Sequence, residues 1–156
     1  DLKKCEGERK DYLDGWQRTK ADFINYKRRE DEQKKELTAL IQEDVFLNII
    51  PVLDSFDMAF ANKEAWEKIS KEWRIGVEYI YSQFLSILET YNIQQFVPTG
   101  EPFDPRSHVP AELVHTSTKT DDHRVLKVMQ KGYKGRGKII RPAQVAIGEY
   151  KEEPAS

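Results

Sequence analysis

The first 44 residues constrain the fold most, because they contain no proline and repeat apolar side chains at alternating steps of three and four positions. This is the spacing of the a and d positions of a coiled coil. Eight of the twelve seam positions are apolar, and the seam runs through Leu2, Cys5, Arg9, Tyr12, Trp16, Thr19, Phe23, Tyr26, Glu30, Gln33, Leu37 and Leu40. One helix of this length cannot bury such a stripe against itself. The sequence therefore predicts a long helix that pairs with a second copy of the chain.

This stripe has a polar gap, because Glu30 and Gln33 occupy seam positions within YKRREDEQKKEL. Oppositely charged residues four positions apart, such as Arg28 and Glu32, stabilise a helix by only ~0.2–0.5 kcal/mol per pair and do not hold it to a partner. The gap is either a solvated face or a locally loose coiled coil whose side chains face another protein. It also predicts that the paired helices separate on heating before the rest of the molecule unfolds.

Residues 45–95 carry two further apolar stripes at helical spacing, in VFLNIIPVLDSFDMAF and WRIGVEYIYSQFLSILETY. Pro51 would break or kink a helix interior unless it lies near a first turn. Gly76 costs its helix ~1 kcal/mol relative to alanine, so it indicates close packing or is an ordinary tolerated glycine. Two copies of this helix pair predict a four-helix bundle. The residues expected at the dimer interface are Trp16, Phe23, Leu37, Leu40, Leu53, Phe56, Ile80, Phe84 and Ile87.

From about residue 96 the apolar period changes from that of a helix to that of a strand. In VLKVMQ, the side chains of Val125, Lys127 and Met129 are expected on one face, and KIIRPAQVAIGEY is a second strand-like run. The residues between these runs, Lys134 to Gly137, are typical of a turn. The sequence therefore predicts an α+β fold with a paired helix over 1–44, a helical dimerisation region over 45–95, a small β domain over 96–151 and a tail over 152–156.

The stretch GYKGRGKI, residues 132–139, matches the phosphate-loop pattern Gly-x-x-x-x-Gly-Lys-Ser/Thr at every position except the last. A phosphate loop needs a helix that starts at the loop and a hydroxyl after the lysine to hold Mg²⁺. Here Lys138 is followed by Ile139, which has no oxygen in its side chain, and Pro142 follows without a helix signal. The stretch therefore predicts a β-hairpin, either structural or used for docking a protein, and no direct nucleotide binding.

No arrangement of residues indicates catalysis. Asp54 and Asp57 lie three positions apart in a helical stretch, which is a weak signal for an acid–base pair. His115 and His123 flank a short acidic stretch, but their spacing fits no standard zinc pattern. We therefore expect no enzyme activity, no metal site and no cofactor.

Composition also limits the partners. With 25 basic and 27 acidic residues the formal net charge is −2, which predicts neither a nucleic-acid nor a membrane partner. A basic run with Tyr133 inside it, from Lys131 to Arg141, leaves nucleic-acid binding as a distant alternative. No apolar run approaches the ~18 residues of a membrane span, and the single Cys5 suits a reducing compartment. These features predict a cytoplasmic protein, with an organelle matrix as the alternative.

Four separated motifs resemble the GrpE family, the nucleotide exchange factors of the DnaK chaperone. They are KADFINYKRR on the long helix, IIPVLDSFDMA in the second region, GEPFDPRSH at the entry to the β domain, and VLKVMQKGY followed by IIRPAQVAI at its end. Their order and spacing cover nearly the whole chain. The resemblance implies a parallel homodimer with a paired long helix, a four-helix bundle and two compact β domains.

The resemblance also implies that the chain acts by binding. One β domain would insert against the ATPase domain of DnaK and hold its nucleotide cleft open, so that ADP leaves. The positions that match the family's contacts are Phe103, Pro105, Met129, Lys138 and Ile147 in the β domain, Lys27, Arg28 and Arg29 on the long helix, and Gly76, which would allow close approach. The heptads alone agree equally well with a structural coiled-coil dimer or a client-holding scaffold that has no exchange activity.

Overall fold

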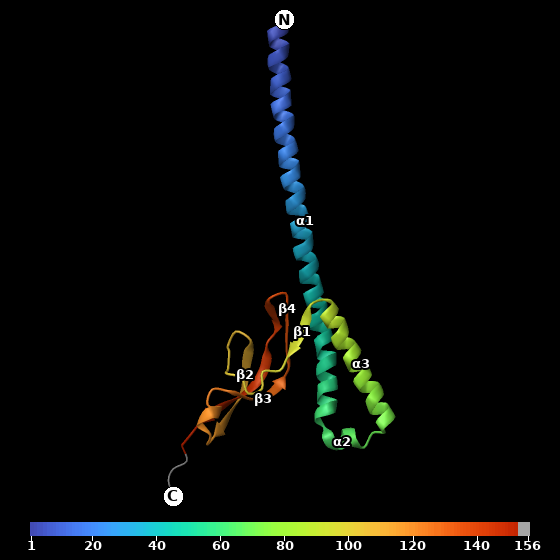
Figure 1. Cartoon of the computed structure of the whole chain (residues 1–156), viewed down its shortest axis with the longest axis vertical. Helices are drawn as coiled ribbons and strands as arrows, with labels where there is room; N and C mark the ends of the chain where they lie inside the picture. The colour runs from blue at the N-terminus through green and yellow to red at the C-terminus, as the bar shows by residue number, and fades with distance from the viewer. Residues whose placement is uncertain (153–156) are drawn as a thin grey trace. The chain divides into compact units, whose positions relative to one another are not determined.

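The computed structural model describes residues 1–152, so residues 153–156 of the expected tail lie outside the described residues. The chain forms two compact units, residues 1–44 and the part that begins at residue 45. Helices occupy the first part of the sequence and strands the last, which confirms the α+β class (Figure 1). No helix in the described chain is long and apolar enough to cross a membrane.

Helix α1, Leu2–Ala61, runs through Pro51 without a break, so this proline does not end the helix. Proline cannot donate the hydrogen bond that would reach the carbonyl four residues earlier. That carbonyl belongs to Leu47, and Leu47 and Pro51 both lie on the exposed side of the helix, so the carbonyl is not left without a partner in an apolar core. The buried residues Phe46 and Ile50 hold the helix on its other side.

Two further helices, α2 (Lys63–Glu67) and α3 (Lys71–Thr90), return the chain beside the end of α1 (Figure 1). Aromatic rings join the two long elements, since the ring centroids of Phe56 and Phe60 lie 5.9 and 5.3 Å from that of Tyr81. Tilted and edge-on ring pairs of this kind add to the stabilisation that comes from burial of apolar surface. They close a helical hairpin within a single chain.

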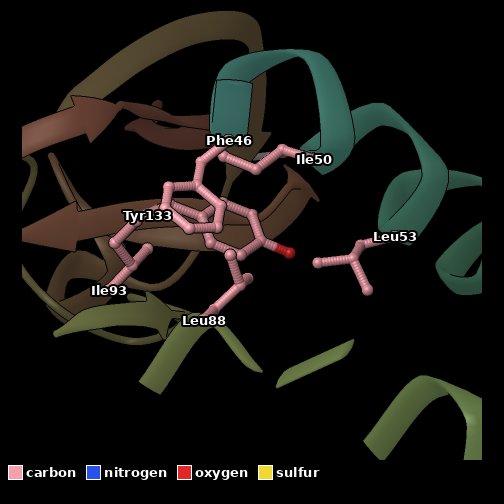
Figure 2. Packing of buried hydrophobic residues seen from close by; sticks show 6 residues of the cluster. All are labelled: Phe46, Ile50, Leu53, Leu88, Ile93 and Tyr133. Atoms are coloured by element: carbon pink, nitrogen blue, oxygen red, sulfur yellow. The ribbon is translucent and has the colours of Figure 1, made fainter. Parts of the chain in front are cut away.

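Strands β1 (Ile93–Phe96), β4 (Gly132–Gly135) and β5 (Lys138–Arg141) form an antiparallel sheet in the order β1-β4-β5, which we call the inner sheet. This sheet packs on the helices through one apolar cluster. The buried members of the cluster, drawn in Figure 2, are Phe46, Ile50 and Leu53 from α1, Leu88 from α3, Ile93 from β1 and Tyr133 from β4. Burial of these side chains fixes the inner sheet to the helical hairpin.

Strands β2 (His108–Thr116), β6 (Ala143–Tyr150) and β3 (Val125–Gln130) form a second sheet in the order β2-β6-β3, which we call the outer sheet. Strand β2 is parallel to β6 and β3 is antiparallel to it. A 3₁₀ turn, η1 (Lys119–Asp121), lies between β2 and β3 in the chain. The outer sheet has its own core of Val125, Ala143, Val145 and Ile147, with Phe96, Phe103 and Val128 packed against it.

Two strand expectations need correction. The run KIIRPAQVAIGEY is divided at Pro142 into β5 and β6, which belong to different sheets. The alternation expected for VLKVMQ holds from Leu126 to Gln130 but not at its first residue, because Val125 is buried whereas Lys127 and Met129 are exposed. The register of β3 on β6 shifts between Val125 and Lys127, and a bulge of this kind turns the following side chains to the other face.

Candidate docking surface

The stretch that matches a phosphate loop is the β4–β5 hairpin. Its two turn residues, Arg136 and Gly137, both have positive φ, 52° and 76°, as a type I′ turn requires. Lys138 begins strand β5 rather than a helix, so the helix N-terminus that makes a phosphate cradle does not follow it. The predicted hairpin is therefore present, and the Lys138 side chain is exposed at its end.

The basic run of this region is divided between the protein interior and the solvent. The Nζ of Lys131 lies 2.6 Å from Oδ1 of Asp57. Arg141 donates two hydrogen bonds to Asp54, from Nη2 to Oδ1 at 2.7 Å and from Nη1 to Oδ2 at 2.5 Å. The exposed basic side chains are Lys134, Arg136 and Lys138. Because Lys131 and Arg141 serve internal ion pairs, less of the run can face phosphates, which weakens the nucleic-acid alternative.

Asp54 and Asp57 are the residues whose role the sequence reasoning missed. Their spacing indicates a shared helix face, but it says nothing about what covers that face. The structure places both carboxylates against the β strands, 74 positions from Lys131 for Asp57 and 87 positions from Arg141 for Asp54. The sequence does show two acidic residues on a helix and two basic residues at or next to strand ends. Which acidic residue pairs with which basic one can be assigned only when the fold is known.

Burial and hydrogen bonds change the ionisation of two side chains beside these ion pairs. Burial alone would lower the pKa of Lys131, but hydrogen bonds to Asp57 and Tyr81 outweigh it and raise the pKa. Burial raises the pKa of Tyr133 to about 12, although the hydrogen bond from Gln95 opposes this shift. Both Lys131 and Tyr133 therefore keep their protons well above neutral pH.

Three of the expected β-domain contacts belong to the outer sheet. Met129 on β3 is 48% exposed and offers a flexible apolar side chain to a partner. Phe103 is half-buried on the outer-sheet core, with its ring centroid 5.8 Å from that of His108. Ile147 is 6% exposed and belongs to the core itself. Phe103 and Ile147 therefore meet in one core, while Met129 remains on the surface.

Pro105, a fourth expected contact, is exposed in the loop before β2. Its neighbour Asp104 ties this loop down, because the Asp104 N–H donates to Nδ1 of buried His108 at 3.0 Å. The Asp104 carboxylate accepts a hydrogen bond from Nε of Arg106 at 3.2 Å, and this bond lowers the pKa of the carboxyl group. The loop therefore presents Pro105 from an ordered turn.

The expected contacts outside the β domain are exposed as well. Lys27, Arg28 and Arg29 lie on α1 within the first unit, where Nε of Arg28 is 4.0 Å from Oε1 of Glu32. An exposed pair at this distance contributes little to stability. Gly76 on α3 is also exposed, and a Cβ added there would meet nothing within 4 Å in a single chain. Close packing at Gly76 would therefore need a second molecule.

The positions expected at the dimer interface fall into two groups. The exposed ones are Trp16, Phe23, Leu37, Leu40, Ile80 and Ile87. Phe56 and Phe84 are half-buried, with ring centroids 6.3 Å apart, and Leu53 is fully buried inside the single chain. Exposed apolar side chains at helical spacing are typical of surfaces that another helix covers.

Within residues 1–152, acidic, cysteine and histidine side chains do not gather into a metal site. In the part of the chain that the structure describes, no group of three or more of them is placed to hold an ion. Nδ1 of His115 lies 3.0 Å from Oε2 of Glu149, and Nε2 of His123 lies 3.5 Å from Oδ2 of Asp122. These histidines have carboxylate neighbours on an exposed surface.

Comparison with known proteins gives a consistent result. A family model described as GrpE matches residues 1–149. The chain is 35% identical over 144 residues to Protein GrpE of Caldanaerobacter subterraneus subsp. tengcongensis, which covers 92% of this chain and 68% of that protein. It is 34% identical over 148 residues to Protein GrpE of Desulfatibacillum aliphaticivorans, covering 94% of this chain and 71% of that protein. The corresponding protein of Pseudomonas putida strain F1 is 32% identical over 132 residues, covering 85% and 71%. The names of these relatives denote no catalytic activity.

Proposed function

Because the chain belongs to the GrpE family, we propose that it is an adenine nucleotide exchange factor that binds the ATPase domain of a DnaK-type chaperone and opens its cleft to release ADP. Membership in the family supports a co-chaperone role in the DnaK system. The observation that carries the proposal is the family match over residues 1–149, which runs through both sheets. Such a protein works where its chaperone works, in the bacterial cytoplasm or an organelle matrix.

The physical basis of exchange is linkage between two ligands of the chaperone. A protein that binds the open cleft more tightly than the closed one must lower the affinity for ADP by the factor by which ADP lowers its own binding. Exchange then needs no nucleotide site on this chain. ATP rebinding closes the cleft and releases the exchange factor.

The β domain supplies the contacts in this proposal. Met129 and Phe103 would provide apolar contact, and Lys138 would pair with a carboxylate of the chaperone. Pro105 lies on the exposed loop beside Phe103, and Ile147 would act mainly through the core that supports it. The basic residues Lys27, Arg28 and Arg29 would add an electrostatic contact from the long helix. Gly76 would let a second surface approach α3.

The proposal includes a homodimer. The exposed apolar side chains of α1 and α3 need a cover, and a second copy offers a matching stripe at the same heptad spacing. Two helical hairpins packed together would make the four-helix bundle expected from the sequence. Sedimentation equilibrium would measure the association directly, and a monomer at micromolar concentration would contradict it.

The decisive experiment measures release of fluorescently labelled ADP from a DnaK-type ATPase domain by stopped flow. We expect release to accelerate with the concentration of this protein and to reach a plateau. A structural dimer or client-holding scaffold, the alternative that the heptads also permit, would leave the release rate unchanged. Absence of acceleration at micromolar concentrations would therefore favour the scaffold and reject exchange.

A further inference from the structure

The inner and outer sheets are joined at two places by a single residue each. Lys131 lies between β3, which ends at Gln130, and β4. Pro142 lies between β5, which ends at Arg141, and β6. Any change in the angle between the two sheets must turn the backbone at these crossings, because each offers few dihedral angles to absorb a rotation.

Both crossings are held by one face of α1. Asp54 accepts two hydrogen bonds from Arg141, the last residue of β5, and a third from Nε2 of Gln130 at 3.3 Å, the last residue of β3. Asp57 accepts from Nζ of Lys131 at 2.6 Å. Because the two carboxylates are three positions apart in a helix, they lie on the same face and reach both crossings together.

The crossings are also tied to each other and to α3. Nη2 of Arg141 donates to the carbonyl of Lys131 at 2.6 Å, so one guanidinium joins both crossings. The Tyr81 hydroxyl on α3 donates to Oδ1 of Asp57 at 3.0 Å and accepts from Nζ of Lys131 at 3.1 Å. The side chains of both ion pairs are mostly buried, with 13–29% of their surface exposed. We call Asp54, Asp57, Lys131 and Arg141 the crossing clamp.

We propose that Asp54 and Asp57 are positioning residues that clamp the two sheet crossings to α1 and so set the angle at which the outer sheet is presented to its partner. This inference rests on the proposed exchange function. A buried ion pair gains little net stability, because desolvation offsets much of the attraction. A bidentate arginine–carboxylate contact does restrict geometry, since both hydrogen bonds form in one orientation only. The clamp therefore contributes more to the orientation of the outer sheet than to the stability of the fold.

The angle matters because Phe103, Met129 and Ile147 all belong to the outer sheet or pack on it, whereas the inner sheet is fixed to the helices. Holding the cleft of the chaperone open requires the outer-sheet contacts to lie in a defined orientation. A small misplacement of these contacts lowers the rate of ADP release more than it lowers the affinity for the chaperone. A loose outer sheet would still bind the chaperone but would hold its cleft open less often. The clamp should thus affect the limiting rate of ADP release more than the half-saturating concentration.

The first test measures the angle without the chaperone. In a Cys5→Ser background, spin labels are placed at Ala59→Cys on α1 and Glu112→Cys on β2, both exposed positions. Labelled chain is mixed with a large excess of unlabelled chain, so that each assembly carries one labelled copy at most. We expect a narrow distance distribution for the parent and a broad or shifted one for Asp54→Asn/Asp57→Asn. Unchanged distributions in the variant would overturn the clamp, whether or not the protein accelerates exchange.

The second test measures ADP release with the same proteins. We expect Asp54→Asn/Asp57→Asn to lower the limiting rate on the order of tenfold while the half-saturating concentration changes by less than about threefold. A variant with an unchanged limiting rate would overturn the positioning role. If the parent itself fails to accelerate release, the proposed function is wrong, and the spin-label result still decides whether the clamp sets the angle.

Two controls separate positioning from folding. Glu64→Gln removes one partner of an exposed ion pair, in which Oε1 of Glu64 on α2 lies 2.9 Å from Nζ of Lys68. This substitution should change neither the distance distribution nor the limiting rate of ADP release. The swap Asp57→Lys/Lys131→Asp restores the attraction with its charges reversed, and Tyr81 can still donate to one member and accept from the other. Recovery of the narrow distribution and the limiting rate in the swap, relative to Asp57→Lys alone, supports the clamp. Failure of a folded swap to recover either readout counts against it.

Discussion

Gln95 donates a hydrogen bond of 2.8 Å to the hydroxyl of Tyr133, whose side chain has no exposed surface. The two residues are paired across β1 and β4. Tyr133 belongs to the apolar cluster that fixes the inner sheet to the helices. Ionisation of its hydroxyl is therefore coupled to the stability of the contact between this sheet and the helices.

This coupling predicts loss of stability at alkaline pH. Burial raises the pKa of Tyr133 from 10.0 to about 12, so the folded chain holds the proton more tightly than the unfolded chain does. The resulting stability is fully present below about pH 10 and is lost as the pH rises through about 12, with a maximum near 3 kcal/mol for a shift of about two units. Lys131, whose pKa is also raised, adds to the same trend above the ordinary lysine pKa.

Urea unfolding followed by circular dichroism at a fixed protein concentration, from about pH 9 to about pH 12, would measure this loss. We expect Tyr133→Phe to flatten the decline, because the buried ionisable group is gone. Tyr12→Phe, which changes a tyrosine that is 79% exposed, is the matched control and should leave the decline unchanged. Identical slopes for the parent and Tyr133→Phe would contradict the assignment.

Close packing at Gly132, the first residue of β4, predicts that a larger side chain there lowers stability. A Cβ added at Gly132 would clash with Cζ of Phe96, a ring packed against the outer-sheet core. We expect Gly132→Ala to destabilise the fold by about 1–3 kcal/mol through overpacking. Phe96→Leu/Gly132→Ala should cost less than the sum of its single substitutions, because the shorter side chain vacates the clash. Strict additivity in chemical denaturation would show that Phe96 is not the obstacle.

The turn signals and the change in apolar period were sufficient to predict the α+β class and the β4–β5 hairpin, but not the division of the strands into two sheets. Residues Lys134 to Gly137 contain the glycines that a tight hairpin needs, and the turn lies at Arg136 and Gly137. The sequence left the effect of Pro51 open between a break and a kink, because that effect depends on whether the lost hydrogen bond faces water, which a local pattern does not show. The bulge in β3 was hidden for a similar reason, since register depends on the strand that pairs with it.

The candidate contacts could be located from sequence only through the family motifs. Burial then separates them, because Met129 is exposed while Ile147 lies in the core. The crossing clamp escaped prediction because an ion pair between Asp54 and Arg141 depends on how the sheets cross, and 87 positions separate the two residues in the chain. Charge alone leaves many other pairings open.

Met129 carries a prediction about docking. Its exposed side chain gives a partner apolar surface without supporting the core. If it is a contact, Met129→Ala should raise the half-saturating concentration for ADP release about tenfold, equivalent to roughly 1.4 kcal/mol, with thermal stability unchanged. Leu113→Ala, which alters a side chain 62% exposed on β2, is the matched control. Equal effects of the two substitutions would show that Met129 has no special place in the contact.

The polar gap in the seam of α1 predicts how the protein responds to heat. Glu30 and Gln33 stand where coiled-coil knobs are needed, so the paired long helices should melt before the part of the chain that begins at residue 45. Calorimetry should therefore show two transitions. Glu30→Leu/Gln33→Leu should raise the first one by roughly 5 °C or more, until it merges with the second. Glu32→Leu/Lys35→Leu adds the same two leucines on the opposite side of the helix and should not raise it. A single transition in the parent protein would contradict separate melting of the long helices.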